Sequence, residues 1–75
     1  MSRGNFSHVE GYNNLGLGEN SHAEGNLTIA SNANAHAEGM STIASGANSH
    51  AGGDNTQATG KNSFTHGQGL KAYGN

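Results

Sequence analysis

The sequence predicts an all-β protein, a parallel β-solenoid in which each coil takes 14 residues. One motif, Ser7-His8-Val9-Glu10-Gly11, returns at residues 21–25, 35–39 and 49–53, and a weaker fifth copy at 63–67 keeps the spacing. A second motif, first seen as Thr28-Ile29-Ala30-Ser31, recurs half a period out of phase. Short fixed periods are typical of stacked supersecondary units, each of which contacts only its neighbours. We therefore predict one β-roll segment over residues 1–75, with about five coils, cut from a longer fibrous protein.

Two short strands are expected in each coil. The segments Ser21–Glu24 and Thr28–Ser31 alternate in character as half-buried strands do. A helix is disfavoured because glycine recurs twice in every 14 residues, and each glycine in a helix costs about 1 kcal/mol. Parallel coils about 4.8 Å apart would make the stack roughly 25 Å tall.

Glycine-rich corners are expected to separate these strands. Glycine permits the positive φ that tight turns need, and asparagine is a non-glycine residue that tolerates it well. The expected corners after the first strand are Gly11, Gly25, Gly39, Gly53 and Gly67, and those after the second strand are Gly18, Asn32, Gly46 and Gly60. Asparagines at positions 20, 34, 48 and 62 follow the second set by two residues, where their amides are placed to cap the corner.

Alternation predicts which side chains fill the lumen and which face outward. Small residues such as Ala23 and Ala30 suit the narrow space between two sheets, whereas burying a column of His and Glu would cost several kcal/mol per ion. The first outer ladder is therefore His8, Glu10, His22, Glu24, His36, Glu38 and His50, and the second is Leu15, Ile29 and Ile43. We expect His50, which faces Gly52, to lack the carboxylate partner of the other copies.

Composition excludes several classes of function. The net charge of −2 and the absence of a basic cluster argue against nucleic acid as a partner. No apolar run is long enough for this segment to insert into a membrane. Nucleophilic catalysis needs one Ser, one His and one acid in a unique pocket, whereas here Ser and His simply repeat, so we expect no enzyme and no cofactor.

The small core predicts self-association. A chain of 75 residues filled largely with alanine and serine buries little apolar area, and chains of this size rarely gain enough stability from a single core. A second copy of the chain is the simplest source of additional buried surface.

The motif resembles the head repeat of trimeric autotransporter adhesins, the YadA-like left-handed parallel β-roll. The resemblance rests on Asn20-Ser21-His22-Ala23-Glu24-Gly25 followed by Thr28-Ile29-Ala30-Ser31, which is similar to the family form Asn-Ser-Val-Ala-Ile-Gly followed by small residues. The His-Ala-Glu-Gly variant also resembles repeats of phage and prophage tail-fibre proteins. The resemblance covers essentially the whole chain.

The resemblance implies a homotrimer of three rolls around a common axis, with a structural or adhesive role. It implies an extracellular location, on a bacterial surface or a virion tail, and a host-surface or matrix ligand as a further partner. The family's axis-facing Val and Ile correspond here to the His and Glu positions, so that the His–Glu ladder becomes the trimer interface.

Two alternative functions follow from the same repeats. Since His and carboxylates bind divalent metals, rings of His22, His36 and His50 from three chains are an alternative metal or anion site. A column of Thr28, Thr42 and Thr56, one per coil, raises the more remote alternative of an ice-binding solenoid.

Overall fold

The chain is a two-sheet parallel solenoid. In a computed structural model that describes residues 3–69 and 71–72, ten strands form two five-stranded parallel sheets. The longer strands, in spatial order, are β1 (His8–Tyr12), β3 (His22–Asn26), β5 (His36–Met40), β7 (His50–Asp54) and β9 (Phe64–Gln68). The shorter strands are β2 (Leu15–Gly16), β4 (Ile29–Ala30), β6 (Ile43–Ala44), β8 (Gln57–Ala58) and β10 (Lys71–Ala72).

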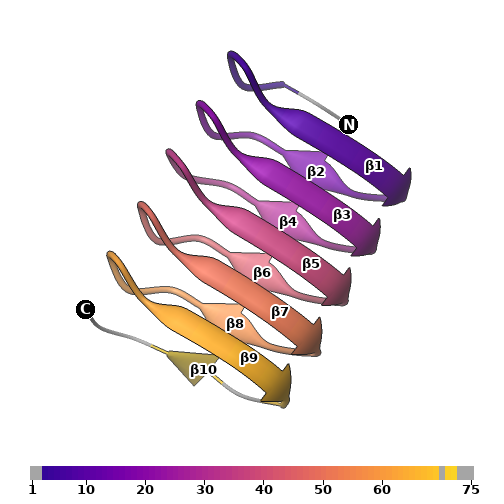
Figure 1. Cartoon of the computed structure of the whole chain (residues 1–75), viewed down its shortest axis with the longest axis vertical. Coiled ribbons are helices and arrows are strands. Elements are labelled where there is room, and N and C mark those ends of the chain that lie inside the picture. Colours follow the sequence, from indigo (N-terminus) through magenta and orange to yellow (C-terminus); the bar gives the residue numbers. More distant parts are fainter. Residues whose placement is uncertain (1–2, 70, 73–75) are drawn as a thin grey trace.

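Each coil contributes one long and one short strand, so the predicted β-solenoid is confirmed (Figure 1). Every paired residue lies 14 positions from its partner, as in His22 beside His36 and Ile29 beside Ile43. The molecule measures 25 × 22 × 10 Å, with β1 and β10 at opposite ends of the stack. Equivalent positions of the repeat therefore form continuous columns along the molecule.

The lumen holds small side chains, as alternation predicts. The buried hydrophobic residues of the described chain are all alanine: Ala23, Ala30, Ala35, Ala37, Ala44, Ala51 and Ala58. Thr28, Thr42 and Thr56 are also fully buried. The hydroxyl groups of Thr42 and Thr56 donate to the carbonyl oxygens of Glu38 and Gly52, at 3.0 and 2.9 Å. The core is therefore thin but partly polar.

The first coil pairs a larger lumen residue with a smaller one. Val9 occupies the column of Ala23 and Ala37, while Gly16 occupies the column of Ala30 and Ala44. A Cβ at Gly16 would lie only 2.7 Å from Cγ2 of Val9. The larger residue on one sheet is therefore accommodated by the smaller one on the other.

The glycines assigned to the first corner lie elsewhere. Gly11, Gly25, Gly39, Gly53 and Gly67 do not close the long strands but lie within them. They have positive φ, as Gly25 shows at +113°, and a Cβ at Gly25 would lie 2.0 Å from the carbonyl oxygen of Gly39. Glycine is needed there because positive φ coincides with close approach of the next coil.

The conformation predicted for the second corner is also wrong. Gly18, Asn32, Gly46 and Gly60 begin the turns but do not have positive φ. Positive φ occurs two residues later, at Asn20, Asn34, Asn48 and Asn62, each near +60°. The amide of Ser21 donates to the carbonyl of Gly18 at 3.2 Å, which fits a type II turn with Asn20 at its third residue.

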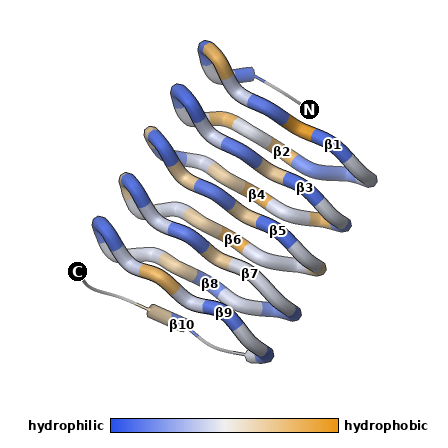
Figure 2. The backbone as a smooth tube through the Cα atoms, viewed as in Figure 1, coloured by the Kyte–Doolittle hydropathy of each residue, from blue (hydrophilic) through white to orange (hydrophobic). Residues whose placement is uncertain are grey.

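The corner asparagines also bond to one another along the stack. The Nδ2 of each donates to the Oδ1 of the next, at 3.2 Å from Asn20 to Asn34, 2.9 Å from Asn34 to Asn48 and 3.0 Å from Asn48 to Asn62. These corners form a hydrophilic edge that is interrupted at the first coil (Figure 2). Their amides therefore stabilise the stacking of coils, a role that the expected capping did not include.

Asn32 replaces glycine in a column where the coils approach closely. A Cβ at Gly46 would lie 2.2 Å from the carbonyl oxygen of Gly60, so close packing, and not φ, explains glycine there. At Asn32 the side chain forms hydrogen bonds to the backbone of its own coil and of the next coil. Its Oδ1 accepts from the amide of Ala33 at 2.8 Å, and its Nδ2 donates to the carbonyl of Ser45 at 3.2 Å.

Removing a lumen hydroxyl at Ser49 is expected to leave stability unchanged or to raise it. Within the described chain, the Oγ atoms of Ser21, Ser49 and Ser63 are buried without a hydrogen-bond partner, while Ala35 holds the same column. Ser49→Ala should therefore change the free energy of unfolding by between zero and about +1 kcal/mol. Urea denaturation measures it.

Thr42→Val is the matched control for that serine. It keeps the side-chain shape but removes a hydroxyl that donates to Glu38, so it should lower the free energy of unfolding by about 1 kcal/mol. If Ser49→Ala costs as much as Thr42→Val, the Ser49 hydroxyl has a partner in the folded protein.

Candidate functional site

Histidine rings are stacked along the outer face of the long-strand sheet. In-register pairing places them one above another, with ring centroids 4.6 Å apart for His8 and His22, 4.5 Å for His22 and His36, and 4.6 Å for His36 and His50. Phe64 continues the column, 4.8 Å from His50. The sheet spacing alone sets this stack, because adjacent strands are separated by nearly the same distance.

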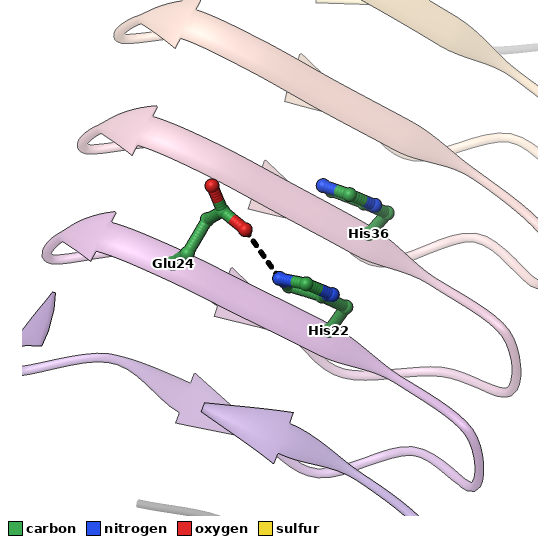
Figure 3. A group of neighbouring side chains, drawn as sticks. All are labelled: His22, Glu24 and His36. Atoms are coloured by element: carbon green, nitrogen blue, oxygen red, sulfur yellow. Dashed lines mark hydrogen bonds and ion pairs between the residues drawn. The ribbon is translucent and has the colours of Figure 1, made fainter. Parts of the chain in front are cut away.

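Three of these histidines are paired with the glutamate two residues later on the same strand. The His Nε2 to Glu Oε1 distance is 2.6 Å for His8 and Glu10 and 2.8 Å for His36 and Glu38. His22 and Glu24 make the same bond, and the ring of His36 lies parallel above His22 (Figure 3). The structure thus brings all seven residues of the first ladder onto one face.

This ladder is only half covered within one chain. About a third of each side chain is exposed at His22 and His36, and His8 and Glu10 are more than half exposed at the first coil. The pairing with His8 lowers the pKa of Glu10, mainly through the hydrogen bond and then through the charge of His8. The face therefore presents paired, solvent-accessible donors and acceptors.

The residue types in the glutamate column change toward the C-terminal end of the ladder. The column that carries glutamate in the first three coils has Gly52 in the fourth and His66 in the fifth. A Cβ at Gly52 would lie 2.7 Å from Cδ2 of His66 and 3.3 Å from Cγ of Glu38. The imidazole of His66 therefore lies over Gly52, and its Nε2 is 3.8 Å from Oε2 of Glu38, two coils away.

His66 is the site residue that sequence reasoning missed. It lies 14 positions after Gly52 and 28 after Glu38, so the period itself places it in the glutamate column.

His50 differs from the other ladder histidines as its Gly52 neighbour predicts. Its Nε2 is buried and has no hydrogen-bond partner within the described chain. Burial lowers the pKa of His50, and the charges of His36 and His66 lower it further, while Glu38 acts in the opposite direction. The folded chain therefore favours neutral His50.

The lowered pKa of His50 makes the stability of the chain depend on pH when no metal ion is bound. Because its folded-state pKa is lowered, the unfolded chain binds more protons, so stability should fall as pH drops below the ordinary value of 6.5. Urea denaturation between pH 5 and pH 7.5, with a chelator present, measures this slope.

His50→Phe is the control, because the next coil already carries Phe64 in this column. The variant should reduce the slope. An unchanged slope would show that other groups cause it. Glu10, whose pKa is lowered, loses its contribution only as pH falls below its ordinary value of 4.5, outside this window.

Two groups of side chains have ligand atoms close enough to converge on a metal ion. These are His22 with Glu24 and His36, and His36 with Glu38 and His50; in each group one ligand atom from each residue lies within 4.8 Å of the others. Each combines two imidazoles and a carboxylate, the ligand types of zinc sites. Within one chain His22, His36 and His50 form a stack, with a glutamate beside the first two. Rings of each histidine from three chains stay a prediction.

The second ladder lies on the outer face of the short-strand sheet. Leu15, Ile29 and Ile43 pair in register and are each half-buried, and Gln57 and Lys71 continue their column. Three of five coils therefore present an apolar side chain there.

The threonine column cannot serve as an ice-binding face. Thr28, Thr42 and Thr56 are fully buried in the lumen, whereas such a face requires outward threonines. Their hydroxyls bond within the chain, with Thr28 donating to Oδ1 of Asn14 at 2.8 Å. The column on which the ice-binding alternative rested is therefore not on the surface.

Comparison with family models, curated protein sequences and solved structures gives no match for this chain. Within residues 3–69 and 71–72, no helix has the length and apolar character needed to cross a membrane.

Proposed function

We propose that this chain is a structural and adhesive segment of a homotrimeric surface fibre, either a phage or prophage tail fibre or the head of a bacterial adhesin. The proposed assembly has three left-handed β-rolls side by side around a common axis, outside the cell or on the virion. The segment has no catalytic activity and needs no cofactor. Its partners are two further copies of itself and a ligand on a host surface or matrix.

The observation that carries this proposal is the uniform register of the two sheets. The first three coils present the same columns on both outer faces, with His and Glu on one and Leu or Ile on the other. Such columns favour lateral association of identical rolls, because each coil meets the same coil of its neighbour.

The core supports the same proposal. Its buried hydrophobic side chains are all alanine, with Val9 packed against them, in a molecule 10 Å thick. A core of this kind buries little apolar area for each residue that folding orders, and burial between chains would add to it.

The His–Glu face is the one proposed to lie at the axis. Its side chains are paired in one chain and still a third exposed, so they retain accessible atoms for bonds to neighbouring chains. Polar groups that recur at fixed spacing also set the register between chains, as buried polar residues do in coiled coils.

Charge reversal at Glu24 is expected to disrupt the trimer. Glu24→Arg would place three guanidinium groups at one level of the axis beside the stacked histidines, where like charges cost several kcal/mol. Sedimentation velocity should show a shift from trimer toward monomer.

Ile29→Lys, on the opposite sheet of the same coil, is the matched control and should leave the trimer intact. If Ile29→Lys dissociates the trimer and Glu24→Arg does not, the apolar ladder faces the axis and the proposed arrangement is wrong.

A further inference from the structure

We propose that one chain carries a zinc-class metal site at the C-terminal end of the ladder, formed by His36, Glu38, His50 and His66. The site needs no second chain, and it does not depend on the proposed fibre function. It is distinct from a ring of equivalent histidines contributed by three chains.

The four side chains come from three successive long strands. His36 and Glu38 lie on β5, His50 on β7 and His66 on β9. The ligand atoms of His36, Glu38 and His50 are within 4.8 Å of one another. The Nε2 of His66 is 3.8 Å from Oε2 of Glu38, and its ring centroid is 6.2 Å from that of His50.

His50 distinguishes this level from the rest of the ladder. The Nε2 atoms of His8, His22 and His36 each bond to a glutamate on their own strand. The Nε2 of His50 is buried with no partner in the described chain. A bound cation would satisfy this nitrogen, and a neutral imidazole is the form that coordinates a metal.

Gly52 makes room for the fourth ligand. A glutamate at residue 52 would pair with His50, as the glutamates of the first three coils pair with their own histidines. A Cβ there would already lie 3.1 Å from Nε2 of His66. Without a side chain at residue 52, His66 reaches over the fourth coil toward Glu38, so the departure from the repeat assembles three imidazoles and one carboxylate.

This ligand set fits a borderline transition metal. Zinc takes four ligands of this kind at about 2.0–2.2 Å, and imidazole also suits Ni²⁺ and Cu²⁺. Two such ligands lie no more than about 4.3 Å apart across the ion, so the ligand atoms of His36, Glu38 and His50 must close by up to about half an ångström. His66 lies outside that group, and its ring must swing further toward His50. Rotation of the partly exposed His36, Glu38 and His66 side chains supplies that movement.

Zinc titration of the whole chain tests the site. Isothermal calorimetry with ZnCl₂ at pH 7.5 should give one zinc per chain, and Co²⁺ should give the strong visible absorption of four-coordinate cobalt. His66→Ala and Glu38→Gln should each weaken zinc binding by roughly tenfold or more. His8→Ala, a histidine of the same column outside the site, should leave the affinity unchanged.

Several results would overturn the site. These are no zinc binding, one zinc per three chains, or an affinity that His66→Ala and Glu38→Gln leave unchanged. A loss in His8→Ala as large as that in His66→Ala would also contradict it. His66 is more than half exposed, so its replacement should preserve the fold, which circular dichroism checks before titration.

Discussion

Gly39→Ala is expected to lower the free energy of unfolding by at least about 3 kcal/mol, or to prevent folding altogether. Gly39 has φ of +102°, a backbone conformation that residues with a side chain rarely adopt. A Cβ there would also lie 2.1 Å from the carbonyl oxygen of Gly53 in the next coil. Both effects act on backbone that cannot move without breaking the register of two strands. Urea denaturation followed by circular dichroism measures the loss.

Gly69→Ala is the matched control for this prediction. Gly69 also has positive φ, at +64°, but among the described residues, its chain neighbours aside, no atom lies within 4 Å of the Cβ that would be added. Its cost should therefore be only that of the left-handed conformation, about 1–2 kcal/mol. Equal costs for the two variants would show that close contact between coils does not require glycine at residue 39.

Ala37→Val is expected to destabilise the chain by about 1–3 kcal/mol, because the lumen has no space for two further methyl groups. The first coil indicates how that cost can be relieved, since Val9 there faces Gly16. Ala44 occupies the column of Gly16, so Ala37→Val combined with Ala44→Gly reproduces the pair of the first coil.

The double variant should be more stable than the sum of the two single changes predicts. Each single variant is expected to be destabilising, Ala44→Gly by about 0.5–1 kcal/mol because glycine weakens a strand. A double-mutant cycle from urea denaturation gives the coupling energy directly. A coupling near zero would show that the two sheets do not share a lumen of fixed volume.

The period and the alternation of residues were enough to predict the two sheets and the contents of the lumen. A strict spacing of 14 leaves one register for parallel coils, so His22 must lie beside His36. The size of Ala23 and Ala30 and the ionisable groups of His22 and Glu24 then decide which side faces inward. These inferences succeed because they depend on repeated features and not on any single residue.

Backbone conformation was harder to predict because glycine occurs for two different structural reasons. At Gly25 it provides positive φ inside a strand, whereas at Gly46 it permits close contact without positive φ. The sequence does not distinguish these two roles, because the residue is glycine in both. Asn34 combines the left-handed conformation with a bonded amide ladder, so an asparagine recurring every 14 residues indicates the turn more directly than the glycines do.

The candidate site was only partly predictable for a related reason. The columns of His36 and Glu38 follow from the period, but His66 reaches Glu38 by lying over Gly52. That contact joins coils two apart, which nearest-neighbour reasoning about repeats does not consider.

The proposed fibre function depends most directly on the number of chains that associate. Sedimentation equilibrium at micromolar concentration, on protein shown to be folded by circular dichroism, measures this number. We expect a molar mass three times the 7.6 kDa of one chain. A folded species at 7.6 kDa, or an assembly of any number of chains other than three, would contradict the proposal.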